Sequence, residues 1–293
     1  MAIQPVWNAK LHISDLRFRQ RMFTERAAYI GVALCATLTV SLLAIILGYV
    51  VFKGASYINW TFLTSLPTPA GEAGGGIINA LFGSFYVVSA ATLIAVPIGV
   101  GAAIFLSEFP TRFLGRGVRF LADVLVAVPS IVIGIAIYAL VVEPTKHFSG
   151  FSGSVAYAFI MIPIIVITTQ EALRLVPTTL REASLSLGVP KWKTILRIVL
   201  PVSSRALLTG LILATARALG ETAPMLFTSF GNPFWTSDIN KPIATVPLLI
   251  FRYATGPYED WHRQAWAAAF LLVVVILLAS VITRFVIRNK FDE

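Results

Sequence analysis

The segment that decides the architecture of this chain is Arg181-Glu182-Ala183-Ser184-Leu185-Ser186-Leu187-Gly188, which closes with Ile198-Val199-Leu200-Pro201. It is basic and amphipathic, glycine interrupts it, and long apolar runs flank it. Hydrophobic residues make up 57% of the chain and charged residues only 13%, whereas soluble domains carry about 25% charged residues. With a mean hydropathy of +0.82, the chain is predicted to be an integral membrane protein that exposes one polar segment.

Working outward from this segment, windows near 20 apolar residues predict six membrane helices. These windows are Ala27–Phe52, Ile77–Leu106, Val118–Val142, Ser152–Leu173, Val202–Phe227 and Gln264–Ile287. We therefore predict an all-α fold, a polytopic membrane helix bundle. Residues 27–287 form the membrane domain, with a polar segment 1–26 before it and a tail 288–293 after it. The elbow, residues 178–201, falls between the fourth and fifth predicted helices.

Basic residues predict the orientation, because Lys and Arg are enriched in cytoplasmic loops. Seventeen of the 23 lie in residues 1–26, between the second and third predicted helices, in the elbow and its flanks, or near the C-terminus. One, Arg217, lies within a predicted helix. The opposite side carries five, at Lys53, Lys146, Lys241, Arg252 and Arg263. Both termini are thus predicted to be cytoplasmic. The net charge of +9 is explained by topology and by the lipid membrane, so no nucleic-acid partner is expected.

The sequence offers no catalytic or cofactor chemistry. The single cysteine, Cys35, cannot form an intrachain disulfide, and His12, His147 and His262 lie in separate polar segments. There is no Gly-x-x-x-x-Gly-Lys-Ser/Thr phosphate-binding loop and no clustered nucleophile, base and metal ligands. We expect no metal, no cofactor and no enzymatic activity. If ATP powers this protein, another polypeptide must hydrolyse it.

The elbow itself predicts two short amphipathic helices. Thr179 and Glu182 match a capping box, which predicts a helix that begins at Leu180. One face of that helix has small residues in its middle, and consists of Leu180, Ala183, Ser184 and Leu187. Small residues let the backbone of a partner come close.

Gly188 suits the left-handed position after a helix, and Pro190 suits the first turn of the next one. The second helix repeats the apolar spacing at Trp192, Ile195, Leu196 and Val199. An alternative is an interfacial helix pair whose apolar face lies in lipid and whose basic face meets head groups.

The order of residues favours a docking role. Glu182-Ala183-Ser184-x-x-x-Gly188, nine further residues and then Ile198-x-Leu200-Pro201 resembles the coupling motif of ABC importer permeases. That family usually has Glu-Ala-Ala, and Ser184 is a similarly small replacement. The resemblance implies that the elbow inserts into a cleft on an ATPase subunit. The residues implied to couple to the ATPase are Glu182, Ala183, Ser184, Gly188 and Pro201.

A charged pair lies within the fifth predicted helix, in Ala216-Arg217-Ala218-Leu219-Gly220-Glu221-Thr222-Ala223-Pro224. A charge at a helix centre in a membrane costs about 2.5–3.5 kcal/mol, so such residues usually face a cavity or each other. Arg217 and Glu221 are four residues apart and can pair on one face. Gly220 permits close approach, and Pro224 should interrupt the helix. The pair is either a structural lock or part of an anion pathway in which Arg217 holds oxyanion oxygens. The pathway would consist of Arg217, Gly220, Glu221 and Thr222.

The block Arg217 to Pro224 resembles the signature of phosphate-specific importer permeases, of the PstA rather than the PstC type. The likeness also covers Gly75–Glu108, Val128–Gly134, Glu171–Pro177 and Pro247–Phe251. It implies a bacterial or archaeal cytoplasmic-membrane complex that imports inorganic phosphate. The implied partners are an ATPase dimer, a second homologous permease and an external phosphate-binding protein. The alternatives are an importer of another oxyanion, such as molybdate or phosphonate, and an ion-coupled secondary carrier.

Overall fold

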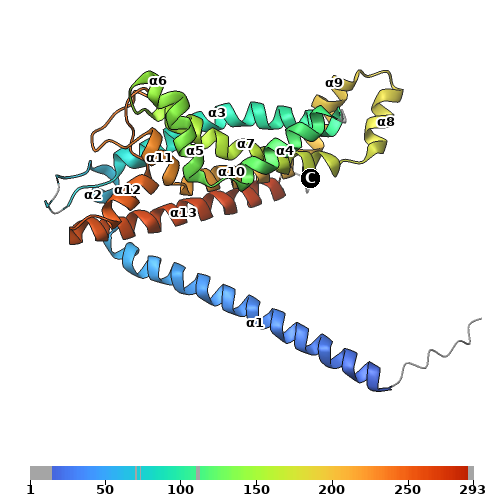
Figure 1. Cartoon of the computed structure of the whole chain (residues 1–293), viewed down its shortest axis with the longest axis horizontal. Helices are drawn as coiled ribbons and strands as arrows, with labels where there is room; N and C mark the ends of the chain where they lie inside the picture. The colour runs from blue at the N-terminus through green and yellow to red at the C-terminus, as the bar shows by residue number, and fades with distance from the viewer. Residues whose placement is uncertain (1–14, 70, 73, 110–112, 290–293) are drawn as a thin grey trace, which may run out of the picture. The chain divides into compact units, whose positions relative to one another are not determined.

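The computed structural model describes residues 15–69, 71–72, 74–109 and 113–289, and within these ranges all regular structure is helical (Figure 1). The chain divides into two units, Met1–Phe52 and Lys53–Glu293. Among the described residues, five helices are long and apolar enough to cross a membrane, and a bent helix pair provides a sixth candidate. The predicted all-α membrane bundle is confirmed.

The first unit is dominated by α1, Asp15–Gly54, a single helix of 40 residues that contains the predicted span Ala27–Phe52. The apolar side chains of that span are exposed except at Leu47 and Val50, which are half-buried. Helix α1 begins inside the predicted polar segment 1–26, whose first 14 residues lie outside the described residues. The predicted tail 288–293 lies outside them from residue 290.

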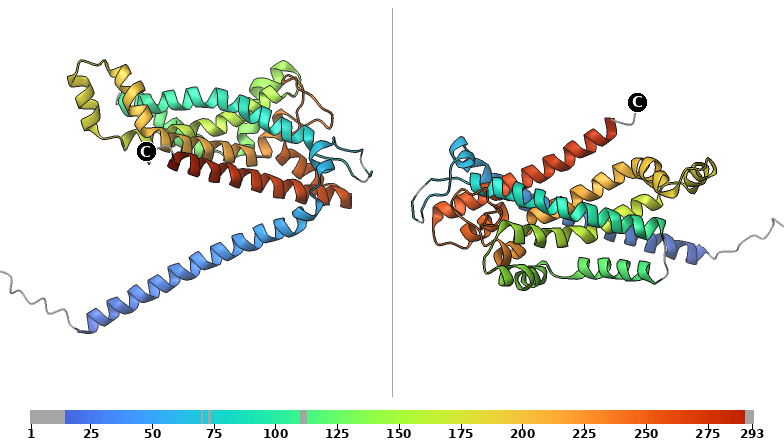
Figure 2. Two further views of the ribbon diagram at one scale, coloured as in Figure 1. Left: turned by 180° about the vertical axis from the view of Figure 1, so that it is seen from behind. Right: turned by 90° about the horizontal axis from the view of Figure 1, so that it is seen from above.

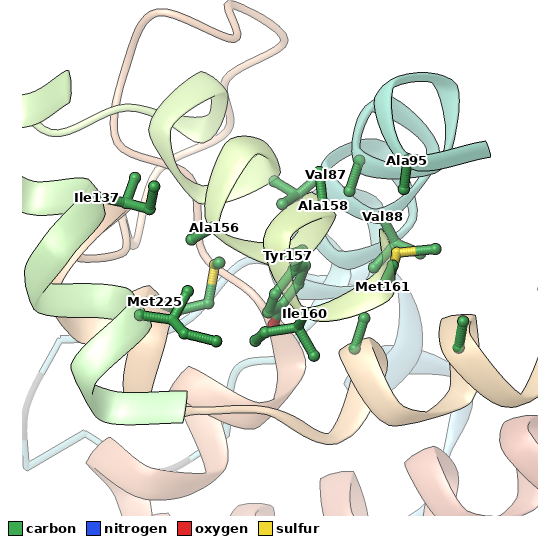
Figure 3. Packing of buried hydrophobic residues seen from close by; sticks show 14 of the residues in the cluster. Val87, Val88, Ala95, Ile137, Ala156, Tyr157, Ala158, Ile160, Met161 and Met225 are labelled. Carbon is green, nitrogen blue, oxygen red and sulfur yellow. The ribbon is translucent and has the colours of Figure 1, made fainter. Parts of the chain in front are cut away.

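The second unit is built on four long helices. They are α3 (Ile78–Glu108), α7 (Gly150–Arg174), α10 (Leu200–Gly220) and α13 (Glu259–Asn289). Figure 3 shows the centre of the core, where Tyr157 and Met161 of α7 cluster with Val87 and Val88 of α3, and Met225 lies on the other side of Tyr157. Helices α3 and α7 pack closely at Gly99. A Cβ atom added there would lie 2.7 Å from the Ile165 side chain, so the close approach requires glycine.

The third predicted span, Val118–Val142, is wrong as a continuous helix. The chain forms α4 (Leu114–Ala127) and α5 (Ser130–Ile137), and the helical run Ser130–Thr145 that begins with α5 is bent by 107° relative to α4. The cause is Pro129, which has no N–H to donate and forces Val128 out of the helical region, to φ −68° and ψ 129°. Helix α5 continues through a π turn, Tyr138–Val142, into α6 (Glu143–Thr145).

The fifth predicted span, Val202–Phe227, is interrupted near Pro224, as the sequence predicted. Helix α10 ends at Gly220, and Glu221 is extended, with φ −84° and ψ 121°. A separate short helix, α11 (Ala223–Thr228), follows with Pro224 in its first turn. The break is stabilised by packing, since Gly134 of α5 lies against the Pro224 backbone at a distance that only glycine allows.

The second unit has two distinct ends (Figures 1 and 2). At one end the elbow projects, with α8 (Thr178–Ser186) and α9 (Lys191–Thr194). At the other end lie α2 (Trp60–Thr64), α6 and α12 (Val246–Ala254). A short 3-10 turn, Ala55–Tyr57, precedes α2. The predicted docking segment and the segments predicted to be external are therefore separated along the length of the bundle.

Candidate functional site

Arg217 and Glu221 form the predicted ion pair at the break between α10 and α11. The Arg217 Nε lies 3.6 Å from the Glu221 Oε1, and the two side chains are 43% and 22% exposed. This distance is longer than a good hydrogen bond. The contact is therefore an ion pair without a close hydrogen bond, and the half-exposed guanidinium keeps donors accessible to a ligand.

Helix α7 forms a hydrogen bond to the main chain at the break between α10 and α11. The Tyr157 hydroxyl donates a 2.8 Å hydrogen bond to the Glu221 carbonyl oxygen, and Tyr157 is fully buried. This bond satisfies a carbonyl group that the end of α10 leaves free. Tyr157 is seven residues past Gly150, the first residue of α7, or about 10 Å along it at ~1.5 Å per residue. The pair thus lies toward the end of the bundle opposite the elbow.

The other predicted passage residues flank the pair. Gly220 is exposed, and a Cβ atom added there would meet nothing within 4 Å. Thr222 is half-buried, and its carbonyl oxygen accepts a 3.1 Å hydrogen bond from the Met225 amide. The open face of the break therefore combines a cation, a carboxylate and unobstructed backbone. Among the described residues, no group of three or more His, Cys, Asp or Glu side chains is placed to hold a metal ion.

At the elbow, the left-handed glycine is confirmed and the capping box is wrong. Gly188 has φ +76°, and its amide and that of Val189 donate to the carbonyl oxygens of Leu185 and Ser184, which closes α8 with a Schellman motif. Helix α8 begins at Thr178, and no side chain caps it. Pro177 precedes it with its φ fixed at −56°, which places Thr179 inside the first turn rather than at the cap.

The second arm of the elbow is not a separate helix. Pro190 caps α9, and α9 continues through a π turn, Ile195–Val199, into α10, so that Lys191–Gly220 is one run of 30 helical residues. Ile195 and Val199 are buried. The expected apolar face is therefore divided between the interior and the surface, where Trp192 remains exposed.

The predicted coupling residues divide into four that are exposed and one that is buried. Glu182, Ala183, Gly188 and Pro201 are exposed. Ser184 is 4% exposed, and its hydroxyl lies 2.8 Å from that of Thr194, so it joins the two arms of the elbow from inside. The exposed face of the elbow is apolar over a wide area, and it includes Leu180, Leu187, Trp192 and Leu196.

Sequence analysis missed the pair Glu108 and Arg181. Glu108 ends α3, is 7% exposed, and accepts a 2.8 Å hydrogen bond from the Arg181 Nη2. Both residues were visible in the sequence, Arg181 as one basic residue of the elbow and Glu108 as an acid at the end of an apolar run. Their partnership was not visible, because 73 residues separate them.

The family of the chain follows from comparison with known proteins. Residues 95–291 match the model of the family described as "Binding-protein-dependent transport system inner membrane component". Two solved structures share the fold. A bacterial alginate ABC importer has a TM-score of 0.64 at 13% identity, covering 93% of this chain and 99% of that one. The MetNI methionine ABC transporter has a TM-score of 0.61 at 15% identity, covering 72% and 94%. The chain is a multi-pass inner-membrane transport component of this class.

Curated relatives define the particular family. The chain is 42% identical to the phosphate transport system permease protein PstA of Yersinia pestis over 241 residues, and this aligned region covers 82% of each chain. It is 45% identical over 244 residues to PstA of Xylella fastidiosa (strain 9a5c), covering 82% of this chain and 85% of that one. The chain belongs to the PstA family of permease proteins. It is a transport subunit, as the resemblance of its elbow to the coupling motif of ABC importer permeases implied.

Proposed function

We propose that this chain is one of two permease subunits of an ATP-driven importer of inorganic phosphate. The observation that carries the proposal is an accessible arginine beside a carboxylate, held at a helix break on the open side of the bundle. The relatives named for phosphate transport support the choice of anion.

Arg217 has the chemistry for a phosphate ion. Its planar guanidinium can bind two oxygens at once and stays charged at any working pH. Glu221, 3.6 Å away, offsets part of that charge, so phosphate is bound weakly enough to be released inward. Gly220 lets the anion approach the main chain, and we assign the Thr222 hydroxyl as an additional polar partner.

The elbow is the surface that receives the force of ATP hydrolysis. Its exposed face combines the small residue Ala183 with Leu187, which is 83% exposed, and burying such apolar surface against a partner is favourable. Glu182, Gly188 and Pro201 are exposed on the same segment. We assign this face to an ATPase dimer, so that closure of the dimer on ATP displaces the elbow and opens the passage outward.

The remaining partners follow from the two ends of the bundle. A second, homologous permease completes the passage, since Arg217 lies on an exposed face. An external phosphate-binding protein delivers phosphate to the end that carries α2, α6 and α12. Both chain termini are then cytoplasmic, on the side of the elbow. A solved alginate importer of the same fold was captured with its periplasmic protein.

The first test is uptake of radiolabelled phosphate by cells that carry Arg217→Gln, with complex assembly and ATP hydrolysis measured in parallel. Loss of a charge-assisted interaction of about 1.5–3 kcal/mol should reduce uptake about 10- to 150-fold while the complex still assembles and hydrolyses ATP. Arg174→Gln is the control, because Arg174 is an exposed arginine paired with Glu171 at the elbow end. If Arg217→Gln prevents assembly, the ion pair is a structural lock and the passage assignment is wrong.

A further inference from the structure

Glu108 is a buried acid at the elbow end of α3. Its Oε1 accepts hydrogen bonds from two nitrogens of Arg181, at 3.1 Å from Nε and 2.8 Å from Nη2. The side chains are 6% and 18% exposed. A carboxylate that is shielded from water is stabilised by such a paired cation, and it becomes an unpaired buried charge if the cation is removed.

The same guanidinium also holds the end of α7. Arg181 Nη1 donates to the Val176 carbonyl oxygen at 2.6 Å, and Nη2 donates to the Leu173 carbonyl oxygen at 2.8 Å. These carbonyl groups lie at the C-terminal end of α7, where a cation is favoured by the helix dipole. One side chain of α8 therefore binds α3 and α7 together, and the fixed fork of arginine suits four bonds in different directions.

The second arm of the elbow holds the same end of α3. Lys191, at the start of α9, donates from Nζ to the Glu108 backbone oxygen and lies 4.2 Å from the centroid of the Phe109 ring. Residues of both arms of the elbow, Arg181 before Gly188 and Lys191 after it, thus contact the end of α3. The chain itself connects the elbow only to α7 and α10, so these contacts form the elbow's polar connection to α3.

We propose that Glu108 and Arg181 are positioning residues of the transport cycle, which make α3 move with the elbow as one body. Helix α3 lies along α7 through the core, as the close approach at Gly99 shows. A displaced elbow would then carry α3 as well as α10, so that both sides of the core rearrange together. The inference rests on the proposed function, in which the elbow is the element that the ATPase displaces.

The test uses the complete complex, with its ATPase, second permease and binding protein, reconstituted in proteoliposomes. Glu108→Gln keeps the side-chain volume and removes the charge. We expect normal assembly and ATP hydrolysis, and a decrease of about tenfold in phosphate transported per ATP hydrolysed, within the usual range of coupling between sites. Glu171→Gln is the matched control, because Glu171 is a 54% exposed acid at the same end whose ion pairs are with Arg174 and with Arg119 of α4. We expect its ratio to be unchanged.

Two further variants separate coupling from folding. Lys191→Met, at an exposed residue, removes the contacts to the Glu108 backbone and the Phe109 ring but leaves the Glu108–Arg181 pair in place. It should decrease the same ratio by a smaller factor. In a Cys35→Ser background, Glu108→Cys with Arg181→Cys should lose coupling, and a short thiol crosslinker should restore it. An unchanged ratio in Glu108→Gln and Lys191→Met overturns the inference. So does a crosslink that stops transport, since the two elements would then have to separate.

An elbow variant distinguishes this inference from the proposed function. Ala183→Arg adds a charged side chain on the exposed face, away from Glu108, and should release the ATPase. If the ATPase stays bound and is fully stimulated, the assignment of the elbow is wrong. If Ala183→Arg releases the ATPase but Glu108→Gln transports normally, only the role of the Glu108–Arg181 pair is wrong.

Discussion

At the scale of single residues, the proposed passage makes Glu221 the residue that would distinguish phosphate from sulfate. It is 22% exposed beside Arg217, so it both reduces the positive charge and offers a carboxylate to a ligand. A phosphate ion carries a P–OH donor near neutral pH, whereas fully ionised sulfate has none. A carboxylate that accepts this hydrogen bond favours phosphate and repels sulfate.

Glu221→Gln should therefore weaken discrimination against sulfate, because the amide can donate a hydrogen bond and carries no charge. In proteoliposomes, external sulfate should inhibit phosphate uptake by the variant complex and leave the unmodified complex unaffected. Glu143→Gln, a change at an exposed acid of α6, is the control. A loss of phosphate uptake without any gain in sulfate inhibition would show that Glu221 has no role in selectivity.

The residues that sequence predicted well are those whose partners are local. Arg217 and Glu221 are one helical turn apart, and Gly188 needs only its own backbone conformation, so spacing and residue type were sufficient. The Glu108–Arg181 pair and the hydrogen bond from Tyr157 to Glu221 join distant parts of the chain. Spacing carries no information about such contacts, because they depend on how α3, α7 and the elbow pack.

At the scale of elements, the two interrupted helices have a common cause. Hydropathy windows measure the length of an apolar run, and they do not detect a change of chain direction within it. Pro129 and Pro224 each remove an N–H donor, and tertiary packing then decides whether the helix bends, breaks or continues. Pro97 lies inside α3, which continues to Glu108, so proline alone does not predict a break.

Gly188→Ala tests the elbow as an element. At φ +76°, an alanine costs about 1–2 kcal/mol relative to the right-handed region, so the turn between α8 and α9 should loosen. We expect the ATPase to dissociate at a lower temperature, measured as the fraction that co-purifies after heating.

Gly117→Ala is the matched control for this change. Gly117 lies within α4 with no atom near its added Cβ, where alanine is favoured by about 0.5–1 kcal/mol. Equal ATPase retention in both variants would mean that the conformation of Gly188 is irrelevant to docking.

At the scale of the whole molecule, the distribution of basic residues predicts which end of the bundle faces the cytoplasm. In a Cys35→Ser background, Asp238→Cys and Ser186→Cys each place a thiol on an exposed residue, before α12 and in the elbow respectively. A membrane-impermeant maleimide should label Asp238→Cys in intact spheroplasts and label Ser186→Cys only after permeabilisation. The opposite pattern would invert the topology and remove the elbow from the reach of an ATPase.

The continuous helical run from Lys191 to Gly220, which includes the π turn Ile195–Val199, has a mechanical consequence. Lys191 and Arg217 are 26 residues apart in this run, which corresponds to about 39 Å at ~1.5 Å per residue. The elbow and the Arg217–Glu221 ion pair therefore lie at opposite ends of the same helix. A tilt of roughly 10° about the elbow would move Arg217 by about 7 Å, more than the width of a phosphate ion, if the helix stays rigid over that length. In the proposed transport cycle, a displacement of the elbow would reach Arg217 along this one helix, while the Glu108–Arg181 contact carries α3 with it.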